Sequence, residues 1–193
     1  FIYPGCGYGG SCFPKDVKAL IRTADEQGYQ SELLQSVEDV NERQKQVLVE
    51  KVKRRFGAEL SGKIFAVWGL AFKPDTGDMR ESAAITIIQE LTKQGAAIRA
   101  YDPKAMEEAR ECYLKGNKRI TYCDSKYEAL KDADALLLIT EWKEFRSPDF
   151  YEIGKLLKTP VIFDGRNQYE AQQVQKYGLD YYQIGVKPII AKG

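Results

Sequence analysis

From residue 61 to the end, short apolar runs alternate with amphipathic segments. The runs predict strands at residues 63–69, 97–101, 119–123, 135–140, 161–164 and 181–184. Apolar residues at three- and four-residue steps between them predict helices at residues 82–94, 102–111, 126–131, 147–157 and 169–177. Some strand runs, such as residues 136–139, lack polar alternation, which is typical of strands that are covered on both faces. The pattern therefore predicts an α/β fold with a doubly wound, mostly parallel sheet.

The first sixty residues show helical periodicity without strand patterns. A short helix is predicted over residues 16–27, and Gly28 suits the position after its C-terminus. A second helix begins at Ser31 and ends at Phe56, and about 25 residues would make it roughly 38 Å long. A helix of this length exceeds a small domain, and its apolar stripe needs a partner throughout. We interpret it as a dimer-forming or domain-bridging helix, and the alternative is a half-exposed connector.

Composition narrows the classes of function. The 193 residues include 29 Lys and Arg, 28 Asp and Glu, and no His. The balanced charge argues against a nucleic-acid or membrane-surface partner, and no apolar run is long enough to span a membrane. Without His we expect no metal site, and acid–base chemistry falls to other side chains. Four cysteines without a C-x-x-C pair indicate a reduced, cytoplasmic protein.

The opening segment, residues 1–16 (FIYPGCGYGGSCFPKD), carries the candidate chemistry. Its glycines allow positive φ and the close approach of another molecule. Pro14 suits the first turn of a helix, so Cys12 would lie just before a helix N-terminus, where the dipole and Lys15 favour a thiolate. Asp16 could reach the same space one turn later. The segment predicts an active-site corner, although a free cysteine is more often an inert buried residue.

Cations follow two of the predicted strands. Residues 69–82 (GLAFKPDTGDMRES) follow the first strand, lack a G-x-G-x-x-G motif, and carry Lys73 and Arg80 before a predicted helix N-terminus. Arg166 follows the fifth strand. Ligands of open parallel sheets bind at the carboxyl ends of the strands, and cations near a helix N-terminus suit phosphate. Each cation alone is better explained as a solvated loop charge, but the three together favour a nucleotide phosphate.

Two long and three short motifs resemble those of the UDP-glucose/GDP-mannose dehydrogenase family. The long ones are residues 9–16 (GGSCFPKD) and 69–82. The short ones are residues 101–103 (YDP), 140–142 (TEW) and 163–166 (FDGR), which follow in the family's order. The resemblance covers essentially the whole chain and is nearest to the UDP-glucose 6-dehydrogenase branch.

The resemblance implies an N-terminal NAD-binding domain, a central helical dimerisation domain and a C-terminal Rossmann-like domain for the nucleotide sugar. Residues 1–60 would be the last part of the central domain, with the catalytic cysteine loop. Residues 61–193 would be the UDP-sugar-binding domain. The NAD-binding domain would be absent, so we expect a fragment that is inactive alone. A homodimer would form through the helix from Ser31 to Phe56, in which Asn41 and Gln44 match a family helix.

The resemblance also implies NAD-dependent oxidation of UDP-glucose at C6 to UDP-glucuronate in two hydride transfers. Cys12 would form a thiohemiacetal and then a thioester, and Asp16 would help to activate the hydrolytic water. Lys15 and Arg80 would reach NAD. The residues in contact with the nucleotide sugar would be Tyr3, Gly5, Gly9, Phe72, Lys73 and Arg166.

Several alternatives stay open at this point. The substrate could instead be GDP-mannose or a UDP-N-acetylhexosamine, or the chain could be a non-catalytic nucleotide-binding dimerisation module. Cys6 has no assigned role, and a disulfide between Cys6 and Cys12 would disable the nucleophile. Cys112 and Cys123 are expected to be structural.

Overall fold

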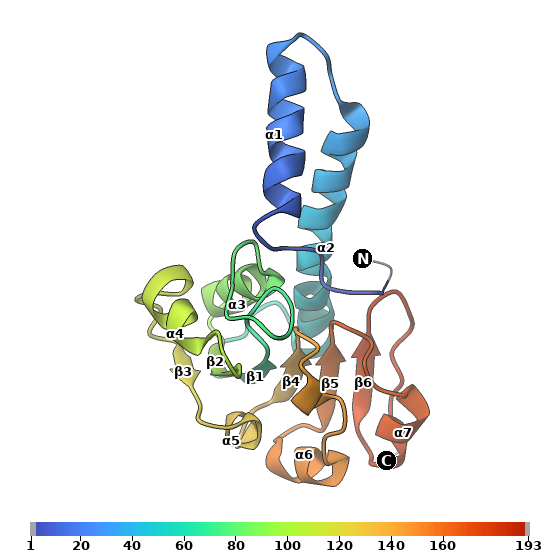
Figure 1. Ribbon diagram of the computed structural model, residues 1–193. Helices are drawn as coiled ribbons and strands as arrows, with labels where there is room; N and C mark the ends of the chain where they lie inside the picture. Colours follow the sequence, from blue (N-terminus) through green and yellow to red (C-terminus); the bar gives the residue numbers. More distant parts are fainter. Residues whose placement is uncertain (1–2, 192–193) are drawn as a thin grey trace.

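A six-stranded sheet forms the centre of the computed structural model, which describes residues 3–191 (Figure 1). Phe1, Ile2, Lys192 and Gly193, which belong to the two predicted domains, lie outside the described residues. The order β3-β2-β1-β4-β5-β6 is doubly wound, and these strands pair in parallel. The predicted fold class is thereby confirmed. The strands are β1 (Ile64–Trp68), β2 (Ala97–Tyr101), β3 (Ile120–Tyr122), β4 (Ala135–Leu138), β5 (Val161–Asp164) and β6 (Asp180–Gln183).

Helices connect successive strands and precede the sheet. They are α1 (Phe13–Glu26), α2 (Glu32–Phe56), α3 (Ala83–Lys93), α4 (Met106–Glu108), the π-helical turn η1 (Ala109–Tyr113), α5 (Lys126–Leu130), the 3-10 turn η2 (Lys143–Phe145), α6 (Phe150–Leu156) and α7 (Ala171–Lys176). Two helices begin clearly later than predicted. The helix expected at residue 102 begins at Met106, because the Asp102 carboxylate holds a turn there by accepting hydrogen bonds from the N–H groups of Lys104 and Ala105. The helix expected at residue 147 begins at Phe150, after its N-cap Asp149.

Helices α1 and α2 form an antiparallel pair that projects from the sheet (Figure 1). The 25 residues of α2 confirm the predicted long helix. Its C-terminal half is buried through Leu48, Val49 and Val52, whereas Leu33 and Val40 of its N-terminal half are 78% and 53% exposed. Helix α2 is thus buried in its C-terminal half and exposed in its N-terminal half. The dimer expected along it stays a prediction.

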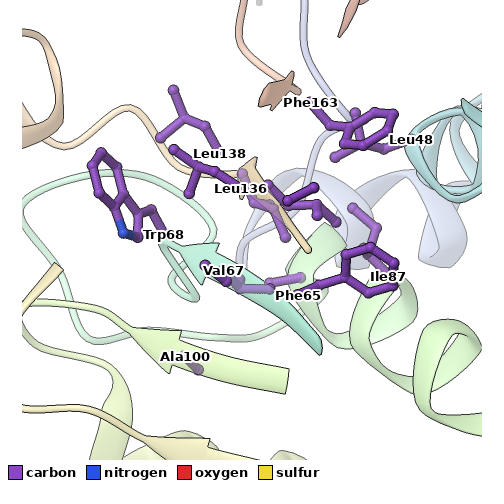
Figure 2. Packing of buried hydrophobic residues seen from close by; sticks show 14 of the residues in the cluster. Leu48, Phe65, Val67, Trp68, Ile87, Ala100, Leu136, Leu138 and Phe163 are labelled. Carbon is purple, nitrogen blue, oxygen red and sulfur yellow. The ribbon is translucent and has the colours of Figure 1, made fainter. Parts of the chain in front are cut away.

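The hydrophobic core contains residues from both predicted parts of the chain. Phe65 of β1, Leu136 of β4 and Phe163 of β5 are fully buried, and Figure 2 shows them in one cluster with Leu48 of α2 and Ile87 of α3. Strands without polar alternation are therefore covered on both faces, as their sequence indicates. The division of the chain at residue 60 stays a prediction, since the second half of α2 packs in the same core as the sheet.

A buried carboxylate follows β2 and accepts hydrogen bonds from several loops at this edge of the sheet. Asp102 is 0% exposed and accepts hydrogen bonds from the N–H groups of Leu70 at 2.7 Å and Ala71 at 3.1 Å. The indole N–H of Trp142 donates to the same oxygen at 3.0 Å. Together with the bonds to Lys104 and Ala105, these contacts join the loops after β1, β2 and β4.

We predict that Asp102→Ala destabilises this chain by about 3–5 kcal/mol, because buried N–H donors of three loops lose their shared acceptor. Urea unfolding followed by far-UV circular dichroism measures the change. Asp124→Ala is the matched control, because Asp124 is exposed and its removal should change stability by less than about 0.5 kcal/mol. Equal unfolding midpoints for the two variants would contradict the role given to Asp102.

Candidate functional site

A cavity of about 750 Å³ lies between the start of the chain, α2 and the loops after β1, β4 and β5. This volume is in the usual range for small-ligand sites. We call residues 3–10, which form one wall, the glycine loop. Each residue predicted to contact the nucleotide sugar lines this cavity, namely Tyr3, Gly5, Gly9, Phe72, Lys73 and Arg166. The structure thus brings together residues that the sequence separates by more than 160 positions.

Polar side chains of α2 bind the backbone of the glycine loop. The Asn41 side chain accepts a hydrogen bond from the N–H of Tyr8 at 2.8 Å and donates one to the carbonyl of Tyr8 at 3.2 Å. Gln44 donates to the carbonyl of Gly5 at 2.6 Å. The sequence suggested only that Asn41 and Gln44 match a family helix. Their position on the apolar stripe of α2 was the available signal that they face another part of the chain.

Glycines are required where the loop meets the rest of the protein. A Cβ atom at Gly9 would collide with the carbonyl oxygen of Glu81, and one at Gly5 would collide with the guanidinium of Arg166. Gly10 has a φ of +99° and donates its N–H to the carbonyl of Arg80 at 2.8 Å. The close approach that these glycines permit is therefore made, in this structure, to the chain itself.

Two cations line the cavity in different ways. Arg166 donates to Glu141 at 2.6 Å, so its guanidinium is held in place by a carboxylate that no sequence argument assigned to the site. The ammonium of Lys73 lies 5.2 Å from the ring centroid of Phe72. Arg80 does not line this cavity, because it is exposed and paired with Asp78 at 2.7 Å. The predicted group of three cations is thus a pair at the cavity and one outside it.

Buried groups of β5 hold the turn that bears Arg166. The Asp164 carboxylate accepts hydrogen bonds from the N–H of Arg166 at 2.8 Å, the N–H of Gln168 at 2.7 Å and the hydroxyl of Tyr181 at 2.6 Å. Burial raises the pKa of Asp164, and the hydrogen bonds oppose this shift. The turn after β5 is therefore held in place by several hydrogen bonds, and it positions Arg166 at the cavity.

Cys12 is the N-cap residue of α1, and Pro14 lies in the first turn, as predicted. Cys12, Lys15 and Asp16 are exposed, and none of them lines the cavity. The pKa of Arg80 is raised, chiefly by its hydrogen bonds to Asp78, and Cys12 is near enough to contribute. An exposed cation that sequence reasoning had not placed at the thiol thus lies near Cys12.

Cys6 lies in a different environment from Cys12. It is 2% exposed, and its thiol donates to the carbonyl of Gly165 with a sulfur–oxygen distance of 3.4 Å. Burial raises its pKa to about 12. The suggested disulfide is not formed, because both cysteines are free and Cys6 packs against Gly165. Cys123 is buried as expected of a structural residue, whereas Cys112 is exposed, which contradicts the same expectation.

The ends of β1 and β4 pack against each other. Ligands of open parallel sheets bind where the strand order reverses, here between these two strands. Gly69, at the end of β1, packs against Thr140, and the Thr140 hydroxyl donates to the carbonyl of Ala71 at 2.6 Å. Asp102, the acidic residue after β2, accepts hydrogen bonds from backbone N–H groups. The loop between β1 and α3 is thus held close to the end of β4.

Within residues 3–191, no helix is both long and apolar enough to cross a membrane. The same residues contain no group of three or more Cys, Asp or Glu side chains that could hold a metal ion.

Comparison with known families gives two matches. The UDP binding domain of the UDP-glucose/GDP-mannose dehydrogenase family matches residues 66–171, and the central domain of that family matches residues 1–43. The chain is 47% identical over 187 residues to a UDP-glucose 6-dehydrogenase of Pseudomonas aeruginosa, a match that covers 96% of this chain and 41% of that protein. It is 40% identical to the UDP-glucose 6-dehydrogenase YwqF of Bacillus subtilis, over 100% of this chain and 43% of that protein.

Solved structures agree with these matches. A UDP-glucose dehydrogenase of Pyrobaculum islandicum superposes with a TM-score of 0.76 at 33% identity, over 88% of this chain and 37% of that one. A UDP-D-ManNAc dehydrogenase of Pyrococcus horikoshii gives 0.75 at 29% identity, over 94% and 40%. The chain spans about two fifths of the length of the curated relatives described above.

The two environments predict selective labelling of the cysteines. Iodoacetamide at pH 8 should modify Cys12 and Cys112, which are exposed, and should spare Cys6, whose thiol is buried and protonated. Peptide mass mapping measures the occupancy at each position. Labelling in urea is the control and should modify all four. Modification of Cys6 as fast as that of Cys12 in native protein would contradict the packing at Gly165.

Proposed function

Since the chain belongs to the UDP-glucose/GDP-mannose dehydrogenase family, we propose that it is the substrate-binding and thiol-bearing part of an NAD-dependent UDP-glucose 6-dehydrogenase. The curated relatives described above carry that name, which favours UDP-glucose. A UDP-N-acetylhexosamine is the second candidate substrate, because the chain also resembles the UDP-D-ManNAc dehydrogenase of Pyrococcus horikoshii.

The observation that carries the proposal is the single cavity shared by the six residues expected at the nucleotide sugar. It offers an aromatic side chain, Phe72, and two cations, Lys73 and Arg166, on loops at the carboxyl ends of β1 and β5. Cations of this kind suit the diphosphate, and the backbone of the glycine loop offers polar groups for the sugar. The cavity wall formed by α2 would be completed by a homodimer along the exposed stripe that contains Leu33 and Val40.

Lys15 and Arg80 are exposed cations beside Cys12, so they fit a dinucleotide that is presented by another domain. The chemistry that NAD would supply is that of a hydride acceptor, with one NAD molecule reduced in each of the two oxidations of the sugar carbon. This chain's residues would hold the substrate and carry the acyl group. The Cys12 thiolate would add to the aldehyde carbonyl and form a C–S bond as a thiohemiacetal, which becomes a thioester after the second oxidation. Water, with Asp16 accepting one of its protons, would then cleave that bond and release the carboxylate, and the leaving sulfur of Cys12 would take the second proton.

Calorimetric titration tests the substrate class on this chain. We expect UDP to bind at least about tenfold more tightly than GDP, which is roughly 1.4 kcal/mol. Arg166→Gln should weaken UDP binding by about 10- to 100-fold, because a charged hydrogen-bond donor to the diphosphate is lost. Arg22→Gln, at an exposed arginine of α1, is the matched control. GDP binding far more tightly than UDP would refute UDP-glucose as the substrate.

The nucleophile is tested in a protein that joins this chain to an NAD-binding domain of the family. Cys12→Ser should reduce formation of UDP-glucuronate by at least about 10³-fold, since the covalent step is lost. UDP affinity should not change, because Cys12 does not line the cavity. The rate of NADH production and the yield of uronate are the measurements, with Cys112→Ser as the control. A Cys12→Ser protein with the normal rate would rule out the thioester route.

A further inference from the structure

Helix α1 carries Cys12 at its N-terminus, but apolar packing holds this helix only weakly. Of its 14 residues, Pro14 and Val17 are the buried ones. Two buried side chains leave the helix free to shift or rotate by small amounts on its neighbours. A nucleophile needs a more exact placement than this, because errors of about 1 Å reduce rates strongly. The ring of Phe13 in α1 also packs on Tyr8, with centroids 4.8 Å apart, and ion pairs add to these contacts in setting where α1 lies.

One carboxylate contacts both α1 and α2. Glu81, in the loop between β1 and α3, accepts a hydrogen bond from the ammonium of Lys18 in α1 at 2.8 Å. Its other oxygen accepts one from Lys45 in α2 at 3.3 Å. The Lys45 side chain is 4% exposed and that of Glu81 is 39% exposed, so this ion pair is partly shielded from water. Each oxygen of Glu81 thus binds a lysine of a different helix.

The contacts continue to the cavity. The Lys18 ammonium also lies 4.0 Å from the carboxylate of Glu38 in α2. Glu38 accepts a hydrogen bond from the hydroxyl of Tyr8, which lines the cavity. Burial raises the pKa of Tyr8, and the Glu38 carboxylate raises it further, so the hydroxyl remains a donor at neutral pH. The chain Glu81–Lys18–Glu38–Tyr8 therefore connects the helix of the thiol with a wall of the cavity.

The backbone of Glu81 is also constrained. Its φ is +54°, in the left-handed region that residues with a side chain seldom adopt. Its carbonyl oxygen occupies the space that a side chain at residue 9 would need. Strained backbone of this kind persists where the surroundings over-determine it, and it is concentrated at functional sites. The hydrogen bond from Lys18 lowers the pKa of Glu81, which keeps the carboxylate charged.

We propose that Glu81 is a positioning residue that sets the location of Cys12 relative to the nucleotide-sugar cavity. The inference rests on the function proposed above. Glu81 does not line the cavity and acts through Lys18 and Lys45. Its role is to hold α1 and α2 to the loop that also carries Lys73. The thiol is thereby held in a fixed position relative to the cations that bind the substrate.

The test uses Glu81→Gln in the protein that joins this chain to an NAD-binding domain of the family, since glutamine keeps the size and removes the charge. We expect kcat to fall by about 10- to 100-fold, while KM for UDP-glucose changes by less than about twofold. Lys18→Gln should also lower kcat, and the double variant should be less slow than the product of the two single effects, because both changes break the Lys18–Glu81 ion pair. Glu26→Gln is the matched control, because it removes an exposed ion pair within α1.

Two kinetic results would overturn the inference. One is a kcat for Glu81→Gln equal to that of Glu26→Gln. The other is a joint change of kcat, KM and thermal midpoint, which would indicate a structural role alone. Hydrogen exchange gives a readout without turnover: Glu81→Gln should speed exchange in residues 13–18, and unchanged exchange would contradict the link. Wild-type protein without UDP-glucose-dependent NADH formation would refute the proposed function, and exchange alone would then decide the role of Glu81.

Discussion

Contacts with α2 and with a loop of the sheet fix the backbone of the glycine loop, and the candidate site depends on this conformation. Asn41 takes up both backbone polar groups of Tyr8, while Gly9 lies against the carbonyl of Glu81 without room for a side chain. The loop is thus held between a long helix and a loop of the sheet. Cys6 secures its other end at Gly165, 159 positions away. Segments that are distant in the sequence thereby become walls of one cavity.

Much of the fold could be predicted from local pattern, because buried parallel strands have an apolar signature of their own. The run at residues 161–164 gave β5 with its observed bounds. The first residue of a helix was less predictable where a side chain hydrogen-bonds to groups outside that helix. Asp102 precedes a proline and looks like a helix cap, but its carboxylate instead serves three loops, which delays α4 to Met106. Such a choice depends on contacts that the local sequence does not contain.

The candidate site likewise has features that the sequence predicts and features that it does not. The strand-end rule pointed to Lys73 and Arg166, because the topology alone brings the carboxyl ends of strands together. The partner of Arg166 could not be foreseen, since Glu141 reaches it from the next strand of the sheet. The bond between Lys18 and Glu81 joins residues 63 positions apart and has no local sequence signal. Residue types thus indicated the chemistry, whereas tertiary contacts determine how the groups are held.

A crystal structure of this chain with UDP-glucose would test the central claim most directly. The claim is that the cavity beside the glycine loop holds the nucleotide sugar. We expect the diphosphate within hydrogen-bond distance of Lys73 and Arg166, the nucleotide inside the cavity, and C6 of the sugar directed toward the N-terminus of α1. A ligand bound elsewhere, with Lys73 and Arg166 free of phosphate contacts, would contradict this assignment.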